Sequence, residues 1–380
     1  MHKILLTVLI LTGLSQADIK SNTEKSLLTA EIQGSEGNKE KEIDALIKKF
    51  GTIGYSTVSI NKNIQTHYYN KYAEKNVEML SFISVLNKEK LRPLLLANPD
   101  FGAYAPFNFL VYKTLDIQED NNTWYGHLST DIMLEIIGEK DEGNRKAFIQ
   151  MIDDFDALVK TEMKPNLSKK FEHTKPLPKN GLLKFVKTFE KTDDIEDFVD
   201  EFIMDYDGRF AKREFIIAGF VDLKFEFDDM DLEFDAYDAF WVSQLCHFEF
   251  SNSIFNRGMP EAGMFAPCSI YFYIPAGTNE LHVGYASVEN WVNALNFKDQ
   301  KRIDYMRKID AEVSELLTNM GFSAVKKEVE VPTAKPSTVI EANTSTTNIS
   351  LPNENAELKT LKKELVRIKT ELEGLIQSIK

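Results

Sequence analysis

The side chains with the greatest chemical potential in this 380-residue chain are its two cysteines, Cys246 and Cys268. A thiol pair can form a disulfide, carry redox chemistry or bind a soft metal ion. For metal binding, His282 is the weak third candidate beside the two thiols. The plain alternative is two small core residues, because free cysteine is among the most buried residue types. The sequence leaves these interpretations open.

The spacing of these residues excludes the commonest zinc arrangement. There is no C-x-x-C pair, and Cys246 and its neighbour His247 would point to opposite faces of a strand. No G-x-S-x-G, H-E-x-x-H, Walker or G-x-G-x-x-G pattern stands in a suitable context either. We therefore assign no catalytic residue and no cofactor, and the sequence favours a protein that is not an enzyme.

The cysteines belong to the second of two similar segments, "NPDFGAYAPFNFLVYK" (98–113) and "MPEAGMFAPCSIYFYI" (259–274). A gap-free alignment of 85–112 with 246–273 pairs a shared set of turn-forming and small residues: Pro99 with Pro260, Asp100 with Glu261, Gly102 with Gly263, Ala105 with Ala266, and Pro106 with Pro267. In the same alignment Cys246 and Cys268 match Val85 and Phe107. Because both positions change together, we expect the two cysteines to face each other across adjacent strands.

The elements around the two motifs follow the same order, which indicates a tandem duplication. In the first copy, strands are predicted at 53–60 and 77–86, a short helix at 88–97, a hairpin after the motif and an amphipathic helix at 146–163. The second copy repeats this with strands within 213–227 and 240–250, a hairpin ending at 279–287 and a helix at 299–322. An acidic amphipathic helix is predicted at 192–210, between the copies.

The order strand, strand, short helix, P-x-x-G-x-x-x-P-C, hairpin and helix resembles the domain of unknown function 302 (DUF 302) family. Members of that family commonly carry "NP…G…LPC" before a strand, with a second cysteine in the strand before the short helix. Here "MPEAGMFAPC" has the whole pattern, and "NPDFGAYAPF" has it without the cysteine. The resemblance covers roughly 50–163 and 213–322. It implies compact α+β domains and no established reaction.

The predicted fold class is therefore α+β, with two tandem compact domains, each an antiparallel sheet packed by helices, and a C-terminal coiled-coil helix. The predicted boundaries are a signal peptide (1–17), a flexible arm (18–40), the first repeat (41–163), a linker with the acidic helix (164–212), the second repeat (213–322), a disordered linker (323–354) and the coiled coil (355–380).

The first 17 residues, "MHKILLTVLILTGLSQA", have the features of a secretory signal peptide. Lys3 precedes an apolar run, and small residues stand near the expected cleavage position. The run is roughly half the ~20 residues that a bilayer span needs, which favours a cleaved leader over a permanent anchor. Loss of Lys3 would change the net charge from −14 to −15, which argues against nucleic acid as a partner. We expect export, to a bacterial periplasm.

The last segment has apolar residues three and four positions apart without a miss: Leu358, Leu361, Leu365, Ile368, Leu372, Leu375 and Ile379. This heptad pattern predicts a parallel coiled coil and hence a homo-oligomer. Glu357 and Glu364 would stand at g positions and Lys362 and Lys369 at e positions, where chains exchange ion pairs. A helix that docks on the protein's own body is the alternative.

Together these features predict an exported binding or accessory module of unestablished activity that self-associates through its C-terminal helix. The ligand or protein partner is not named by the sequence. The alternative is a periplasmic thiol redox or soft-metal-handling protein that uses Cys246 and Cys268, with the first repeat serving a structural role.

Overall fold

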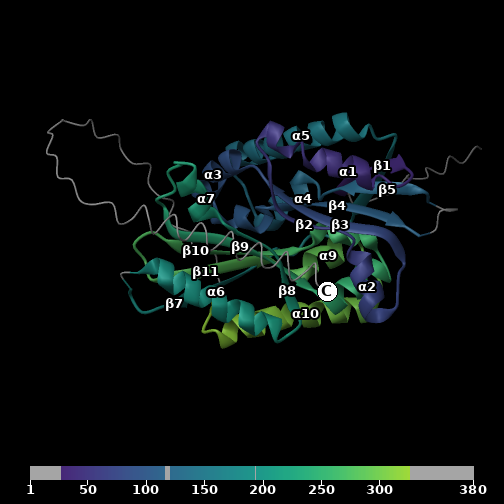
Figure 1. Ribbon diagram of the computed structural model, residues 1–380. Coiled ribbons are helices and arrows are strands. Elements are labelled where there is room, and N and C mark those ends of the chain that lie inside the picture. Colours follow the sequence, from purple (N-terminus) through teal and green to yellow (C-terminus); the bar gives the residue numbers. More distant parts are fainter. Residues whose placement is uncertain (1–26, 116–119, 193, 326–380) are drawn as a thin grey trace, which may run out of the picture. The chain divides into compact units, whose positions relative to one another are not determined.

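The computed structural model describes residues 27–115, 120–192 and 194–325 (Figure 1). These residues form two six-stranded antiparallel sheets, each packed by helices, as the α+β class predicted. Within these ranges no helix combines the length and the apolar character that a bilayer span requires. The predicted signal peptide, nearly all of the 323–354 linker and the predicted coiled coil lie outside the described residues.

The first repeat runs from residue 27 to 173. Its elements are β1 (Leu27–Glu36), α1 (Glu40–Ile47), η1 (Phe50–Ile53), β2 (Ser56–Asn61), α2 (Ile64–Tyr72), β3 (Val77–Leu86), α3 (Lys88–Ala97), η2 (Pro99–Tyr104), β4 (Phe107–Thr114), β5 (Asn122–Gly126), α4 (Thr130–Ile137), α5 (Glu142–Met163) and β6 (Leu167–His173).

The second repeat runs from residue 182 to 324. Its elements are β7 (Leu182–Thr188), α6 (Ile195–Ala211), β8 (Phe215–Asp222), α7 (Leu223–Asp229), β9 (Tyr237–His247), α8 (Phe248–Ser251), η3 (Asn252–Asn256), η4 (Pro260–Phe265), β10 (Cys268–Pro275), β11 (Glu280–Ala286), α9 (Val288–Ala294), α10 (Gln300–Asn319) and β12 (Ser323–Ala324).

The two sheets have the same topology, which confirms the tandem duplication. The first has the order β2-β3-β4-β5-β1-β6, and the second, taken in the matching direction, has β8-β9-β10-β11-β7-β12. Every strand of one repeat therefore has a counterpart in the other, from β1 and β7 to β6 and β12. The predicted hairpins are present as the antiparallel pairs β4–β5 and β10–β11.

The predicted flexible arm (18–40) is wrong for its described part. Residues 27–36 form β1, which lies between β5 and β6 in the first sheet. Its buried residues include the polar Thr29 and Ser35 beside Ala30 and Ile32. The Thr29 hydroxyl donates to the Ala294 carbonyl at 2.7 Å, so the structure satisfies a polar atom that made this strand look like a solvated segment.

The predicted linker (164–212) is also wrong, because both sheets extend into it. Residues 167–173 form β6, an edge strand whose exposed lysines hide its pairing with β1, and residues 182–188 form β7. The acidic helix is confirmed as α6. Its first turn is capped by Asp194, whose carboxylate accepts a hydrogen bond from the Asp197 N–H at 3.0 Å. This helix belongs to the second repeat, as the counterpart of α1.

Long helices cover the outer face of each sheet. Figure 1 shows α1 and α5 along the first sheet and α6 and α10 along the second. The apolar face predicted for α5 is buried, including Phe148 and Ile152, and Phe155 packs edge-on against Phe107 of β4 at 5.4 Å between ring centroids. On the second sheet, Phe202 of α6 lies 5.6 Å from Phe272 of β10.

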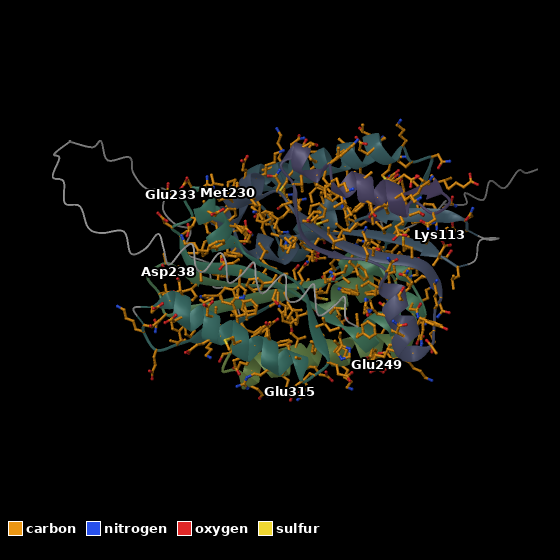
Figure 2. The ribbon with its side chains drawn as sticks, in the orientation of Figure 1. Lys113, Met230, Glu233, Asp238, Glu249 and Glu315 are labelled. Atoms are coloured by element: carbon orange, nitrogen blue, oxygen red, sulfur yellow. The ribbon has the colours of Figure 1, made fainter. Side chains whose placement is uncertain are left out.

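Side chains fill the space between these layers (Figure 2). Most buried residues are aliphatic or aromatic, and a paired lysine is among the exceptions. Lys113 of β4 is only 2% exposed, and its ammonium group forms an ion pair with Glu78 at 2.7 Å. Burial of an ammonium group without such a partner would be costly, so the pair makes this position of β4 tolerable.

The repeated motif holds the two repeats together. A Cβ atom placed on Gly102, in η2, would lie 2.6 Å from the Cβ of Tyr271 in β10. One on Gly263, in η4, would lie 2.9 Å from Leu110 in β4, the position that matches Tyr271. Each motif thus packs on the other repeat's sheet, and only glycine permits this approach. The contact is reciprocal, as across a twofold axis, and we call it the pseudo-twofold interface.

Polar contacts follow the same reciprocity. The Asn108 side chain donates to the Gly263 carbonyl at 2.8 Å, and its counterpart Ser269 donates to the Pro106 carbonyl at 3.5 Å. The edge strands β2 and β8 also meet, where the Asn61 amide donates to the Ala218 carbonyl at 2.9 Å. The interface therefore joins backbone to side chain in both directions.

The acidic residue of the motif breaks the symmetry. Asp100 is 7% exposed, forms an ion pair with Lys184 of β7 and accepts a hydrogen bond of 2.6 Å from the Tyr271 hydroxyl. Its counterpart is Glu261, and the position that matches Tyr271 is Leu110, which has no hydroxyl group to donate; burial raises the pKa of Glu261. The two halves of the interface thus differ in chemistry although their backbones correspond.

We expect the substitution Gly102→Ala to lower the free energy of unfolding by about 1–3 kcal/mol, because the added methyl group would overlap Tyr271. Urea denaturation measures the change. The control is Gly208→Ala in α6, where nothing lies within 4 Å of an added Cβ and alanine should stabilise the helix by about 1 kcal/mol. Two variants with equal effects would contradict the role given to Gly102.

Candidate functional site

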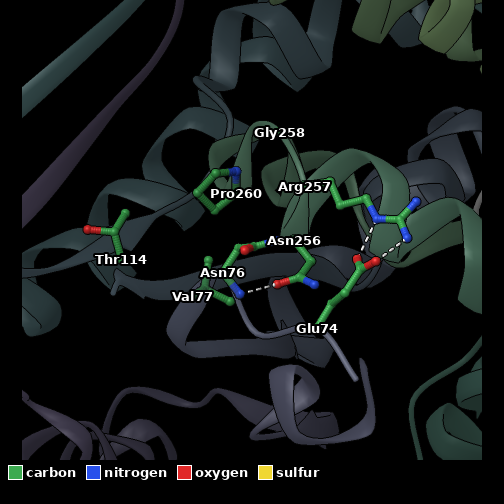
Figure 3. Close-up of a pocket in the computed structure, with 8 residues that line it drawn as sticks. All are labelled: Glu74, Asn76, Val77, Thr114, Asn256, Arg257, Gly258 and Pro260. Atoms are coloured by element: carbon green, nitrogen blue, oxygen red, sulfur yellow. Dashed lines mark hydrogen bonds and ion pairs between the residues drawn. The ribbon is translucent and has the colours of Figure 1, made fainter. Parts of the chain in front are cut away.

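A cavity of about 590 Å³ lies where the two repeats meet (Figure 3). The first repeat contributes residues from the start of β3 and the end of β4, and the second contributes the segment between α8 and η4. The lining residues are Glu74, Asn76, Val77 and Thr114 from the first repeat, and Asn256, Arg257, Gly258 and Pro260 from the second.

An ion pair across the interface borders the cavity. The Arg257 guanidinium group donates to both oxygens of the Glu74 carboxylate, at 2.5 Å each, in the bidentate geometry that carboxylates favour. The hydrogen bond from Arg257 lowers the pKa of Glu74, and the same bond raises the pKa of Arg257. Both side chains are therefore charged at neutral pH and joined at the edge of the cavity.

The wall beside this pair is a buried carboxamide with a fixed orientation. Asn256 is 3% exposed; its Oδ1 accepts a hydrogen bond from the Asn76 N–H at 2.9 Å, and its Nδ2 donates to Asn252 at 2.7 Å. Residues 252–256 form a π-helical turn, in which the Arg257 N–H reaches the Asn252 carbonyl. Such a turn accommodates one extra residue, and π-bulges are frequent at functional sites.

Gly258 lets the backbone of this segment lie close to Arg302, because it has no side chain. An added Cβ on Gly258 would lie 2.3 Å from the Arg302 guanidinium group, which donates to the Arg257 carbonyl at 2.7 Å. Arg302, on α10, thereby holds the backbone beside the Glu74 pair. The position of Arg257 is set by contacts on both of its sides.

The lining can recognise a polar molecule. It presents a carboxylate, a guanidinium group, two carboxamides and a hydroxyl group, and Pro260 adds apolar surface beside the buried Val77. None of the eight lining residues is a serine, cysteine, histidine or lysine, and the one carboxylate, Glu74, is paired with Arg257. The arrangement can bind and orient a ligand through hydrogen bonds.

The two cysteines are free thiols in the structure. Cys268, on β10, lies opposite Leu245, the residue before Cys246 on β9. Opposed residues of an antiparallel pair share a face of the sheet, and successive residues alternate faces. Cys246 and Cys268 therefore point to opposite faces. The prediction that they face each other is wrong, and the disulfide, one of the alternatives that the sequence left open, is not formed.

The error has a local cause. In the first repeat Phe107 lies opposite Val85, and in the second Cys268 lies opposite Leu245. The structural counterpart of Val85 is thus Leu245, one residue from the position that the gap-free alignment assigned. The extra residue is taken up in the π-helical turn at 252–256, which separates β9 from the motif.

The environment of each thiol keeps it protonated at neutral pH. Burial raises the pKa of Cys246 to about 11 and, together with the nearby Cys246 and Asp310, raises the pKa of Cys268 to about 12. The thiolate is the form that attacks disulfides and binds metals. Neither site has the electropositive, accessible surroundings of a reactive cysteine.

The third weak metal candidate lies away from both thiols. His282 of β11 is opposite Tyr273, five residues along β10 from Cys268, and stacks on that ring at 4.9 Å. Burial lowers its pKa, and its Nε2 lies 3.3 Å from the Glu280 carboxylate. Among the described residues, no group of three histidine, cysteine, aspartate or glutamate side chains is placed to hold a metal ion.

The predicted oligomerisation residues, from Leu358 to Ile379, lie outside the described residues. Of the cavity residues, only Pro260 belongs to a pattern that the sequence made visible, the repeated motif. The others carried no recognisable motif. A comparison of the two repeats at corresponding positions could have revealed these residues. That comparison requires the correct alignment, which includes the extra residue in the π-helical turn at 252–256.

A buried polar group beside Cys268 gives the second repeat a pH dependence. The Ser287 hydroxyl donates to the Asp310 carboxylate at 3.1 Å, but burial outweighs this bond and raises the pKa of Asp310 to about 6. In the first repeat the corresponding position of α5 is Ile152. A carboxyl group has therefore been placed in the second repeat where the first has an aliphatic side chain.

We expect Asp310→Asn to stabilise the protein above pH 6 and to have little effect near pH 4. The folded protein holds the Asp310 proton up to about pH 6, whereas the unfolded chain releases it near 3.8. The free energy of unfolding of the native sequence therefore falls between these values, by about 1–3 kcal/mol, and the amide removes this loss. Urea denaturation at pH 4.5 and pH 7.5 measures it; a pH-independent effect would contradict the assignment.

No family model and no curated protein matches the sequence of this chain. A solved structure, the uncharacterized conserved protein DUF302 from Bacillus stearothermophilus, has 14% sequence identity, a match over 37% of this chain and 95% of that chain, and a TM-score of 0.28. The two six-stranded sheets of this chain fit two tandem domains.

Proposed function

We propose that the protein is an exported binding or accessory module whose ligand site is the cavity between its two repeats. The observation that carries this proposal is the shared lining of the cavity, four residues from each repeat, bordered by the bidentate pair of Glu74 and Arg257. Ligand sites are concave and carry a few convergent polar groups on pre-formed walls. The cavity has these features.

The rigidity of the walls supports binding. Asn256 and Arg257 each have partners on more than one element, so their polar groups are held in place before a ligand arrives. A pre-organised site loses little conformational entropy on binding. The part-exposed Pro260 adds an apolar surface that a ligand can cover.

Export is proposed from the first 17 residues, with Lys3 before the apolar run and small residues before the expected cleavage position. The net charge of −14 fits a protein that does not use a phosphate backbone as its partner. A periplasmic location would give the cavity access to small molecules that enter from outside the cell.

Self-association is proposed through residues 355–380, in a parallel coiled coil. The supporting pattern is the unbroken three-and-four spacing from Leu358 to Ile379, with oppositely charged residues at the g and e positions. An oligomer would present several copies of the cavity on one assembly, which raises the apparent affinity for a ligand that has several binding groups.

The ligand is tested on protein purified from its native compartment. We expect mass spectrometry after denaturation to find a small molecule bound to the native protein and depleted at least fivefold in Arg257→Gln, which removes the bidentate pair. Arg213→Gln is the matched control, because Arg213 forms an exposed ion pair with Glu315 away from the cavity. Equal amounts of ligand in the two variants would contradict the proposed site.

The assembly is tested by light scattering on residues 18–380 and 18–354. We expect the longer chain to have a mass of two or more copies and the shorter chain the mass of one, because the apolar seam is removed. Replacing Leu365 by lysine in the longer chain should have the same effect at constant length. A mass that does not change on deletion would remove the coiled-coil proposal.

A further inference from the structure

The cavity has a counterpart on the other side of the pseudo-twofold interface. Val77 begins β3 and lies opposite Thr114, and Tyr237 begins β9 and lies opposite Pro275. Both strands bulge at the next residue, Glu78 or Asp238, so the two registers agree at this end of the sheet. Val77 in the cavity wall therefore corresponds to Tyr237 in the other half.

In the other half the chain fills this place with its own aromatic ring. Tyr237 is 6% exposed, and its hydroxyl donates to the Leu95 carbonyl in the last turn of α3 at 2.8 Å. The ring of Phe234 packs on it at 5.0 Å between centroids. A phenol is thus held between the start of a strand and the end of the facing helix.

In the cavity half the same two positions are Glu74 and Val77. The facing helix ends in the π-helical turn that contains Asn256, the counterpart of the last turn of α3. Val77 is 2% exposed and has no aromatic ring, and Glu74 points toward Arg257 and pairs with it (Figure 3). The cavity therefore borders the strand position at which the second repeat has a tyrosine side chain.

We propose that the cavity binds a phenolic ring, in the position that Tyr237 occupies in the other half. This inference rests on the proposed binding function and names its ligand class. The ring would lie against Pro260, beside the start of β3, and its hydroxyl would donate to an oxygen acceptor of the turn that ends at Asn256, as Tyr237 donates to the Leu95 carbonyl. A polar substituent on the ring would reach the pair of Glu74 and Arg257.

The probe is p-cresol, the side chain of tyrosine as a free molecule, titrated into the full chain and followed by calorimetry and by ligand-observed NMR. We expect one site per native chain, with Kd on the order of 1 mM for so small a ligand. Toluene, which has the ring without the hydroxyl group, should bind at least fivefold more weakly. Equal binding of toluene, or no binding of p-cresol, would overturn the phenol proposal.

Two substitutions exchange the side chains of the corresponding positions 77 and 237. Val77→Tyr supplies the ring from the chain, so it should abolish p-cresol binding and raise the urea midpoint. Tyr237→Val removes the phenol ring from the other half of the interface, so it should give a second p-cresol site per chain. Tyr237→Phe keeps the ring and should leave one site. Circular dichroism confirms folding of each variant. Undiminished p-cresol binding in Val77→Tyr would overturn the proposed position.

The source of the phenol is distinguished by a second probe. The peptide Gly-Tyr-Gly presents the same ring on a chain, and binding tighter than that of p-cresol indicates a tyrosine-containing partner, whereas weaker binding indicates a free small molecule; either supports the phenol class. If p-cresol does not bind but a molecule still co-purifies with the native protein and is lost in Arg257→Gln, the phenol class fails and the binding function stands.

Discussion

The structure depends on the close approach of each motif to the other repeat's sheet. Gly102 and Gly263 bring the backbone of η2 and η4 within contact distance of β10 and β4, and no residue with a side chain would allow it. Each sheet has one face covered by its own helices. The remaining face needs a partner, because an apolar sheet surface is not stable in water. The motif supplies that partner from the same chain.

This constraint explains why the motif is retained while its surroundings have diverged. Asp100 has an ion pair with Lys184 and a hydrogen bond from Tyr271, whereas Glu261 has neither partner at the matching positions. Ile152 has become Asp310, and Tyr237 matches Val77. The backbone of the interface is the same in both halves. Its side chains have changed wherever the close approach of the glycines did not restrict them.

The sequence was sufficient for the features that depend on local patterns. The apolar face of α5, the acidic helix α6 and the duplicated motif follow from periodicity and from turn-forming residues. The strand β1 was missed because its buried residues include Thr29, whose hydroxyl has its partners far along the chain, in His173 of β6 and in Ala294 of the other repeat. The pairing of the cysteines was missed because a single inserted residue in the turn at 252–256 shifts the register, and a one-residue slip reverses which face a side chain occupies. The cavity follows from a comparison of Val77 with Tyr237, which requires the three-dimensional correspondence.

The covalent link between the repeats has a consequence for what the interface can become. Two separate copies of one domain, joined across a true twofold axis, would share every substitution, so a change that opened one recess would open both. In the fused chain each position is encoded twice and can mutate once. One half can keep Tyr237, whose ring supports folding, while the other half has Val77 at the same position and leaves a cavity beside it. The stability lost with the ring is then lost in one half of the interface and not in both.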